Sequence, residues 1–173
     1  MGTLIPNNQP APTFTLHDLQ GNPHSLDSYL GRVVVLNFWS AECPHAERAD
    51  RELTPCLDQW GGEVALVSIA SNTNEPLDLL QRVADERGLP LVLHDPTGQV
   101  ADSYAAVTTP HLYVLDQDGI LRYQGALDDV TFRQRTPTRF YLRQAVEAVL
   151  AGQAPEPAQT SPYGCTIVRF NQD

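Results

Sequence analysis

A cysteine stands where a buried strand is predicted to give way to a helix, in the segment 37–46, NFWSAECPHA. At a helix N-terminus the unpaired backbone N–H groups and the helix dipole stabilise negative charge, so we expect the pKa of Cys43 to be lowered and its thiolate to be populated near neutral pH. Pro44 suits the first helical turn because its missing N–H would have no partner there. His45 can add a positive charge or a hydrogen-bond donor in the same turn. These residue types indicate nucleophilic thiol chemistry at Cys43.

The two other cysteines stand at very different separations from Cys43 along the chain. Cys56 lies on the same predicted helix, where a rise of ~1.5 Å per residue places it about 20 Å away. A disulfide needs Cα atoms within ~7 Å, so we expect Cys56 to be a buried structural residue. Cys165 follows the Pro-rich segment 153–162. No helix fixes its distance from Cys43, because a flexible arm could fold back and bring the two cysteines together. The residues 163–170 could equally pack as an apolar tail on the sheet edge, and both interpretations stay open.

Buried strands alternate with helices along the rest of the chain. The continuous apolar run over 33–39 is typical of a central strand covered on both faces, and the Asp118-Gly119 pair predicts a hairpin turn. The predicted strands are 13–16, 33–39, 64–70, 91–94, 109–116 and 120–125, and the predicted helices are 44–60, 76–87 and 138–151. This order predicts an α/β domain with a mixed sheet covered by helices on both faces.

Two motifs, NFWSAECPHA at 37–46 and TTPHLYVLDQDG at 108–119, together resemble the thioredoxin superfamily. The similarity is to its redoxin branch, which groups thiol:disulfide oxidoreductases of the TlpA and ResA kind with the alkyl hydroperoxide reductase and thiol-specific antioxidant proteins, and it covers about residues 10–151. The resemblance implies that Cys43 is the attacking nucleophile, and that Pro110 follows a cis peptide bond and faces that cysteine with Thr109 beside it. It also implies a thioredoxin-like mixed sheet flanked by helices over 1–152. The change of composition after Gly152 indicates a Pro-rich linker and C-terminal arm over 153–173.

The sequence also departs from the family pattern at several positions. Ala46 stands where family oxidoreductases carry the second cysteine of C-x-x-C, so CPHA is similar to the C-P-H-C of DsbA but cannot form a disulfide within the motif. The buried acid of classical thioredoxins is replaced by Asn37. Peroxiredoxins share a Ser or Thr at the position of Ser40, but they carry a proline where this chain has Leu36 and an Arg near the position of Pro110. A conventional peroxidase site is therefore incomplete.

The resemblance predicts a thiol-disulfide oxidoreductase or antioxidant redoxin with Cys43 as nucleophile. A subset of redoxin-like proteins has a C-terminal Gly-Cys-x-Ile sequence similar to the one here, which makes Cys165 a possible resolving cysteine. In this hypothesis His45 tunes the pKa of Cys43, Ser40 hydrogen-bonds the thiolate or the substrate, and Thr109 and Pro110 hold the substrate. The expected partners are a disulfide or peroxide substrate and a thiol reductant. The alternatives are a thiol peroxidase of atypical two-cysteine type and a redox-inactive binding or metal-carrying module.

Charge and composition narrow the remaining possibilities. The 173 residues carry a formal net charge of -10 and the sequence pI is about 4.7, which argues against nucleic acid or an anionic membrane as partner. His111 follows Pro110 and could approach Cys43, but copper chaperones of this fold have a C-x-x-x-C pair that Cys43 lacks, so we expect no metal and no cofactor. The first sixteen residues have neither a basic nor a long apolar run, so we expect no secretion signal and a cytoplasmic location, or a periplasmic one if a leader has been removed.

Overall fold

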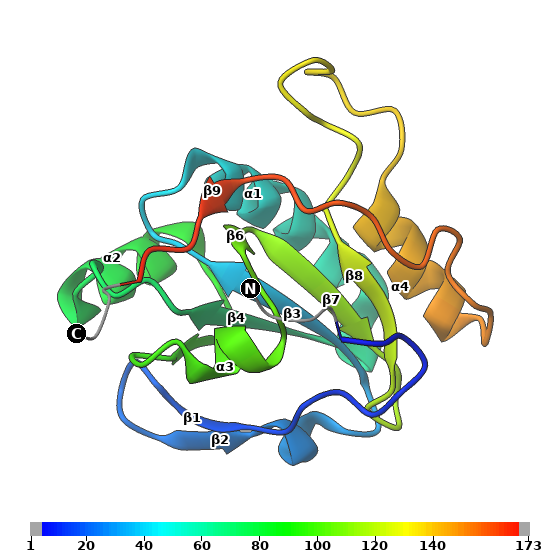
Figure 1. Cartoon of the computed structure of the whole chain (residues 1–173). Helices are drawn as coiled ribbons and strands as arrows, with labels where there is room; N and C mark the ends of the chain where they lie inside the picture. The colour runs from blue at the N-terminus through cyan, green and yellow to red at the C-terminus, as the bar shows by residue number, and fades with distance from the viewer. Residues whose placement is uncertain (1–4, 170–173) are drawn as a thin grey trace.

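A seven-stranded mixed sheet forms the centre of the computed structural model, which describes residues 5–169 (Figure 1). Its strand order is β2-β1-β5-β4-β3-β7-β8, and a separate two-stranded sheet joins β6 to β9. The strands are β1 Thr15–Asp18, β2 Pro23–Ser25, β3 Val33–Trp39, β4 Val64–Ala70, β5 Val92–His94, β6 Thr108–Thr109, β7 His111–Leu115, β8 Leu121–Gly125 and β9 Cys165–Thr166.

The two longest strands, β3 and β4, form the buried middle of the sheet. They run parallel from Val33 opposite Val64 to Trp39 opposite Ala70, and every residue of both strands is buried. β7 pairs with the other edge of β3 in the antiparallel sense and continues into β8 through the predicted hairpin. Unbroken apolar runs suit these strands because both faces are covered.

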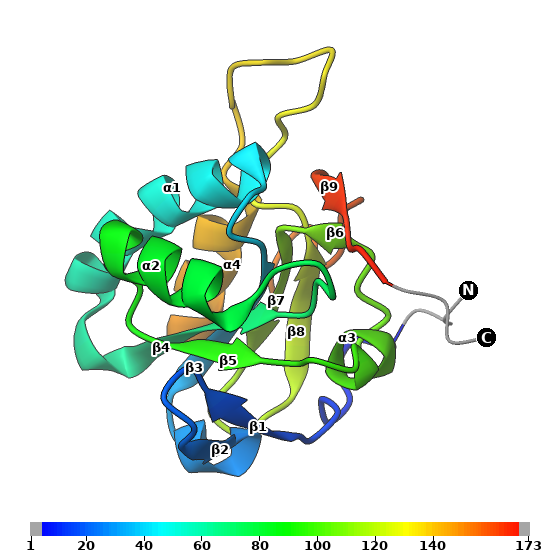
Figure 2. The ribbon, with the colours of Figure 1, turned by 90° about the vertical axis from the view of Figure 1, so that its left-hand side faces the viewer.

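Helices cover both faces of this sheet (Figure 2). Alternate residues of β3 pack against α1 and α4 on one face and against α3 on the other, while Trp39 at the end of β3 packs with α1 and α2. The helices are α1 Pro44–Trp60, α2 Leu77–Arg87, α3 Gln99–Ser103 and α4 Tyr141–Leu150, with short 3-10 turns at Leu26–Tyr29 and Gly61–Glu63. The predicted α/β class with a thioredoxin-like mixed sheet is confirmed.

The residues after α4 pack against the sheet on their way back toward α1 (Figure 1). Gln124 in β8 forms an isolated parallel bridge with Gln159, so the segment expected to be a linker lies along this edge of the sheet. Gly125 at the end of β8 has φ 143°, and a Cβ atom placed there would overlap Thr160. The arm then reaches β9 and ends within the described part of the chain at Arg169, so the rest of the predicted arm, 170–173, lies outside the described residues.

A few elements differ from the sequence prediction. The first strand begins at Thr15, the last helix begins at Tyr141 rather than 138, and β2 and α3 have no counterpart in the prediction. These elements are three to ten residues long, so their apolar periodicity is too short to define them. Within residues 5–169, none of the helices has the length and apolar character needed to cross a membrane.

Gly125 provides a test of how the arm rests on the sheet. We expect Gly125→Ala to lower the free energy of unfolding by about 2–4 kcal/mol, because the new Cβ both forces an unfavourable backbone conformation and collides with Thr160. Gly62→Ala is the matched control, since a Cβ at Gly62 meets no atom within 4 Å. Urea denaturation of both variants measures the difference, and equal midpoints would contradict this packing.

Candidate active site

Cys43 caps the N-terminus of α1. The turn from Ser40 to Glu42 leads out of β3, and Cys43 adopts an extended conformation with φ -87° and ψ 120° before Pro44 begins the helix. Its carbonyl accepts the first helical hydrogen bond, from Glu47 N–H at 3.0 Å. Only 3% of Cys43 is exposed. The thiol therefore lies where the helix offers unpaired N–H groups and is shielded from solvent.

The loop before β7 lies directly against this thiol. The Thr109–Pro110 peptide bond is cis, and both residues are buried. The Cys43 thiol donates a hydrogen bond to the Thr109 carbonyl at 3.1 Å. The structure thus brings together the two sequence motifs that carry the family resemblance.

Cys165 completes the group from the other end of the chain. β9 pairs with β6 in the antiparallel sense and places Cys165 opposite Thr109. The Sγ atoms of Cys43 and Cys165 are 2.6 Å apart, although they are 122 positions apart in the chain. An S–S bond is ~2.05 Å long, so the fold places the two sulfur atoms for a disulfide with each other.

Gly164 and Ile167, the glycine and isoleucine of the Gly-Cys-x-Ile sequence, each have a structural role beside Cys165. A Cβ atom at Gly164 would overlap the Thr109 carbonyl and lie 3.1 Å from Cδ of Pro110, so only glycine allows the arm to approach this closely. Ile167 is buried in the core on the α3 side of the sheet, and its N–H donates to the Val107 carbonyl at 3.1 Å. The glycine permits contact, the isoleucine anchors the strand, and the cysteine between them faces Cys43.

The two thiols have opposite pKa shifts. Burial raises the pKa of Cys43, but donors to its sulfur outweigh burial and bring its pKa below the ordinary value; these donors are the Cys165 thiol, the Thr109 side chain and the backbone N–H groups of Ala46 and Cys165. Burial and the adjacent Cys43 sulfur raise the pKa of Cys165 to about 11. Cys43 therefore ionises first, and the Cys165 S–H then donates its hydrogen bond to the Cys43 thiolate.

Ser40 hydrogen-bonds a buried carboxylate rather than Cys43, so only the substrate half of its predicted role stays a prediction. Its hydroxyl donates to a carboxylate oxygen of Glu75 at 2.5 Å, and the backbone N–H of Ala41 donates to the other oxygen at 2.8 Å. Glu75 is only 6% exposed, so its carboxylate fixes the turn before Cys43 from inside the protein. The sequence prediction missed this role because Glu75 lies near the start of another helix, where a carboxylate is ordinarily explained by helix capping.

Asn72 connects the same carboxylate to the arm. Its side-chain NH₂ donates to Glu75 at 2.9 Å, and its side-chain oxygen accepts the backbone N–H of Val168 at 2.7 Å. The backbone N–H of Thr73 also donates to the Val168 carbonyl, at 3.0 Å. One buried network therefore holds both the turn that carries Cys43 and the strand that carries Cys165.

The histidines and the third cysteine lie apart from this chemistry. The ring of His45 packs edge-on against Tyr163 with centroids 5.0 Å apart, and the groups that lower the pKa of Cys43 do not include its imidazole. Burial lowers the pKa of His111 to about 4, and its Nδ1 accepts the backbone N–H of Val107. Cys56 is buried in the core between α1 and α4. Across residues 5–169 no three His, Cys, Asp or Glu side chains cluster as metal ligands would.

Comparison with known proteins places this geometry in a family. The sequence profile of the AhpC/TSA family matches residues 7–124. The thiol-disulfide oxidoreductase ResA of Geobacillus thermodenitrificans is 34% identical over 122 residues, which cover 68% of this chain and 67% of the relative. The chain belongs to the AhpC/TSA family. The redoxin-branch assignment made from the two motifs is confirmed, and the chain is an oxidoreductase of the thiol-disulfide type.

Two solved structures extend the similarity over the arm. An uncharacterized conserved protein from Geobacillus kaustophilus superposes with a TM-score of 0.89 and 28% identity, covering 99% of this chain and 96% of the other. A hypothetical protein from Sinorhizobium meliloti gives a TM-score of 0.87 and 27% identity, covering 98% of each chain. These two folds therefore match the present one well beyond the residues of the family profile.

The hydrogen bond from Cys165 to Cys43 leads to a testable pKa effect. In Cys165→Val the site stays filled but loses its donor, so we expect the pKa of Cys43 to rise and its alkylation by iodoacetamide to shift to higher pH. Cys165→Ser is the matched control, because the hydroxyl can still donate. Peptide mass spectrometry at a series of pH values measures the alkylation of Cys43. Identical pH profiles for the two variants would show that the donor does not set the pKa.

Proposed function

We propose that this protein is a thiol-disulfide oxidoreductase in which Cys43 is the attacking nucleophile and Cys165 is the resolving cysteine. The observation that carries the proposal is the 2.6 Å approach of the two sulfur atoms at the N-terminus of α1. Ala46 replaces the usual second cysteine of the motif, so the arm supplies the second thiol in its place. The expected partners are a disulfide substrate and a thiol reductant.

The reaction proceeds by two thiol-disulfide exchanges. The Cys43 thiolate attacks one sulfur of a disulfide R–S–S–R, forms a mixed disulfide Cys43–S–S–R and releases one RS⁻. Cys165 then loses its proton and attacks Sγ of Cys43, which forms the Cys43–Cys165 disulfide and releases the second RS⁻. The two protein thiols are oxidised, the substrate is reduced by two electrons, and an external dithiol restores the starting state.

The order of these steps follows from the coupling between the two thiols. The Cys43 sulfur is one of the causes that raise the pKa of Cys165 to about 11, through their hydrogen bond and through charge repulsion. When Cys43 becomes a mixed disulfide it carries no charge, so this cause disappears and Cys165 ionises more readily. The resolving thiol is thus held protonated until the intermediate that it must attack has formed.

The surrounding residues take supporting roles in this proposal. Pro44 begins the helix whose N-terminus stabilises the thiolate, and the backbone N–H of His45 hydrogen-bonds Cys165. Thr109 and Pro110 form the wall against which the reacting sulfur of the substrate rests. Ser40 acts indirectly, because its hydroxyl binds the Glu75 carboxylate, which fixes the turn before Cys43.

The surroundings of Cys43 favour a disulfide over a peroxide as the oxidant. Peroxide cleavage needs donors that stabilise the departing oxygen. Arg48 of α1 pairs with Asp128, and Arg87 of α2 binds Asp50 and the Ala41 carbonyl, so neither guanidinium is free to act as such a donor. A departing thiolate needs less assistance, because it is the weaker base.

Oxidation of the reduced protein tests the roles of the three cysteines. After treatment with a small disulfide and tryptic digestion, we expect a Cys43–Cys165 cross-linked peptide in the wild-type protein and in Cys56→Ser. Cys165→Ser should stop at a mixed disulfide on Cys43, and Cys43→Ser should form neither product. A stable adduct on Cys43 in the wild-type protein, with Cys165 still open to alkylation, would exclude the resolving role.

A further inference from the structure

The arm occupies the backbone edge to which an extended polypeptide would bind beside Cys43. An exposed strand edge binds peptides by adding them as a further strand. Here β9 takes that position on β6, with Thr109 opposite Cys165 and Thr108 opposite Thr166. The hydrogen bond from Ile167 N–H to the Val107 carbonyl extends the contact by one more residue. The edge next to the nucleophile is therefore filled by the chain itself.

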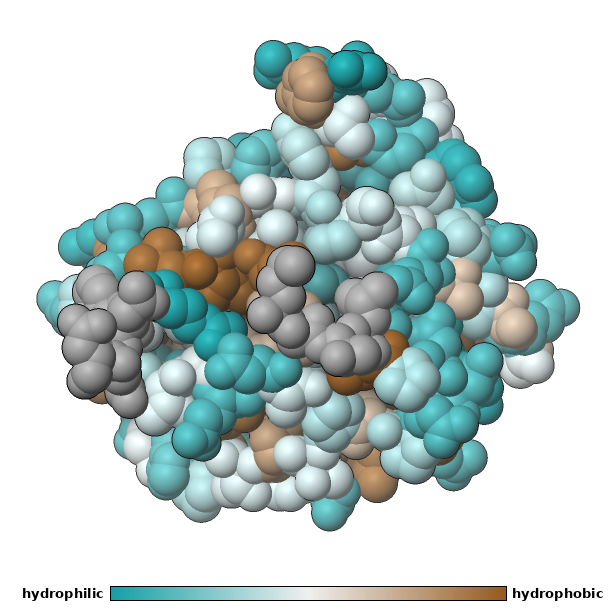
Figure 3. Space-filling view, viewed as in Figure 1, coloured by the Kyte–Doolittle hydropathy of each residue, from teal (hydrophilic) through white to brown (hydrophobic). Residues whose placement is uncertain are grey.

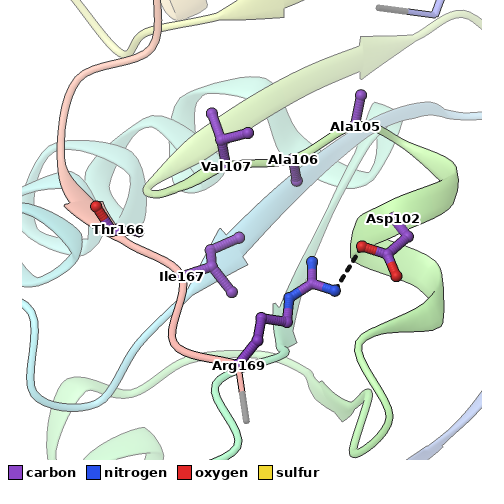
Figure 4. Close-up of a pocket in the computed structure, with 7 residues that line it drawn as sticks. All are labelled: Asp102, Ala105, Ala106, Val107, Thr166, Ile167 and Arg169. Carbon is purple, nitrogen blue, oxygen red and sulfur yellow. Dashed lines mark hydrogen bonds and ion pairs between the residues drawn. The ribbon is translucent and has the colours of Figure 1, made fainter. Parts of the chain in front are cut away.

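The contacts that hold the arm in place include several that involve neither sulfur atom. Figure 4 shows Ile167 pointing toward the segment 105–107 and Arg169 reaching back to Asp102, with which it forms an ion pair. Asn72 and Thr73 bind the backbone of Val168 from the opposite side. Contacts on both sides thus hold the arm in place without a bond between the two sulfur atoms.

The molecular surface around β9 combines a hydrophobic band with an open groove. The space-filling view has a hydrophobic band where β9 and the residues after it cross the molecule (Figure 3). The open groove beside the arm has a volume of about 360 Å³ and is bordered by Val107 and Thr166. It lies at the end of the β6–β9 ladder away from Cys165, so a chain resting in the groove would not pair with Thr109.

The two kinds of disulfide substrate therefore face different obstacles. A polypeptide must lift β9 from β6 and withdraw Ile167 from the core before its own backbone can pair beside Cys43. A small disulfide needs only the side chain of residue 165 to turn aside, because it has no strand to add. Building on the proposed function of Cys43, we propose that the oxidant of this site is the disulfide of a small thiol and that the docked arm excludes polypeptide disulfides.

The chemical step is the first exchange described above with R as a small group. The Cys43 thiolate attacks one sulfur of the small disulfide, one RS⁻ leaves, and Cys165 then displaces the second RS⁻ to close the protein disulfide. No further oxidant or reductant is required for this half of the cycle. Reduction by an external thiol completes it.

Cys165→Ser isolates the first exchange, because the adduct then remains on Cys43. We would react this variant with bis(2-hydroxyethyl) disulfide and, in parallel, with the disulfide-linked dimer of a ten-residue peptide that contains one cysteine. Acid quenching and mass spectrometry give both rate constants, each divided by the rate of the same reagent with free glutathione. We expect a normalised rate for the small disulfide that is well above the rate for the peptide.

Releasing the arm in that background tests the cause of the difference. Ile167→Asp removes the apolar anchor, and Gly164→Val prevents close approach to Thr109; Gly62→Ala is the distant control. We expect each arm variant to accelerate the peptide reaction roughly ten- to hundredfold, the factor that corresponds to burying one isoleucine side chain. Releasing the arm also withdraws the hydroxyl of residue 165 from Cys43, which affects both reagents alike, so the expected gain is in the ratio of the peptide rate to the small-disulfide rate. A measurable reaction with the small disulfide also reports that the site remains folded.

The possible outcomes separate this inference from the proposed function. Equal normalised rates for both reagents in Cys165→Ser, or no gain for the peptide in either arm variant, would overturn the exclusion of polypeptides. Absence of any adduct on Cys43 with both reagents in all variants would instead refute Cys43 as the nucleophile. Faster peptide exchange in the two arm variants alone supports the inference.

Discussion

The antiparallel pairing of Thr109 with Cys165 is the interaction on which the site depends. It fixes the second sulfur against the first at the N-terminus of α1, and it does so without help from the motif, where Ala46 has replaced a cysteine. The pairing is possible only because Gly164 presents no side chain to the Thr109 carbonyl. A two-residue strand is weak by itself, so the core contacts of Ile167 must supply much of the stability that keeps it docked.

Hydrogen bonds through Glu75 and Asn72 connect the turn that carries Cys43 to the arm that carries Cys165. The carboxylate holds the turn before the nucleophile, and the carboxamide carries the connection to the backbone of the arm. Burial strengthens such polar networks and makes an unsatisfied member costly. The relative position of the two thiols is therefore determined by buried groups that never contact the substrate.

Sequence reasoning was strongest where the physics is local. The apolar run of β3 and the proline at the start of α1 placed Cys43 correctly, because strand burial and helix initiation are decided by neighbouring residues. It failed for Ser40, whose partner Glu75 comes from a separate segment of the chain. It left the destination of Cys165 open, because pairing across 122 residues depends on the assembled sheet rather than on any local pattern.

The span between the two cysteines also ties the redox state to the resistance of the whole fold to unfolding. In the proposed cycle the disulfide closes a loop of 122 residues, which contains β4, β5, β7 and β8 of the seven-stranded sheet. Such a loop restricts the unfolded chain by about 5 kcal/mol in the chain-entropy description of cross-links. By thermodynamic linkage the folded state favours closure of the bond to the same extent. In each catalytic cycle, oxidation would therefore raise the free energy of unfolding of the domain, and reduction would lower it again.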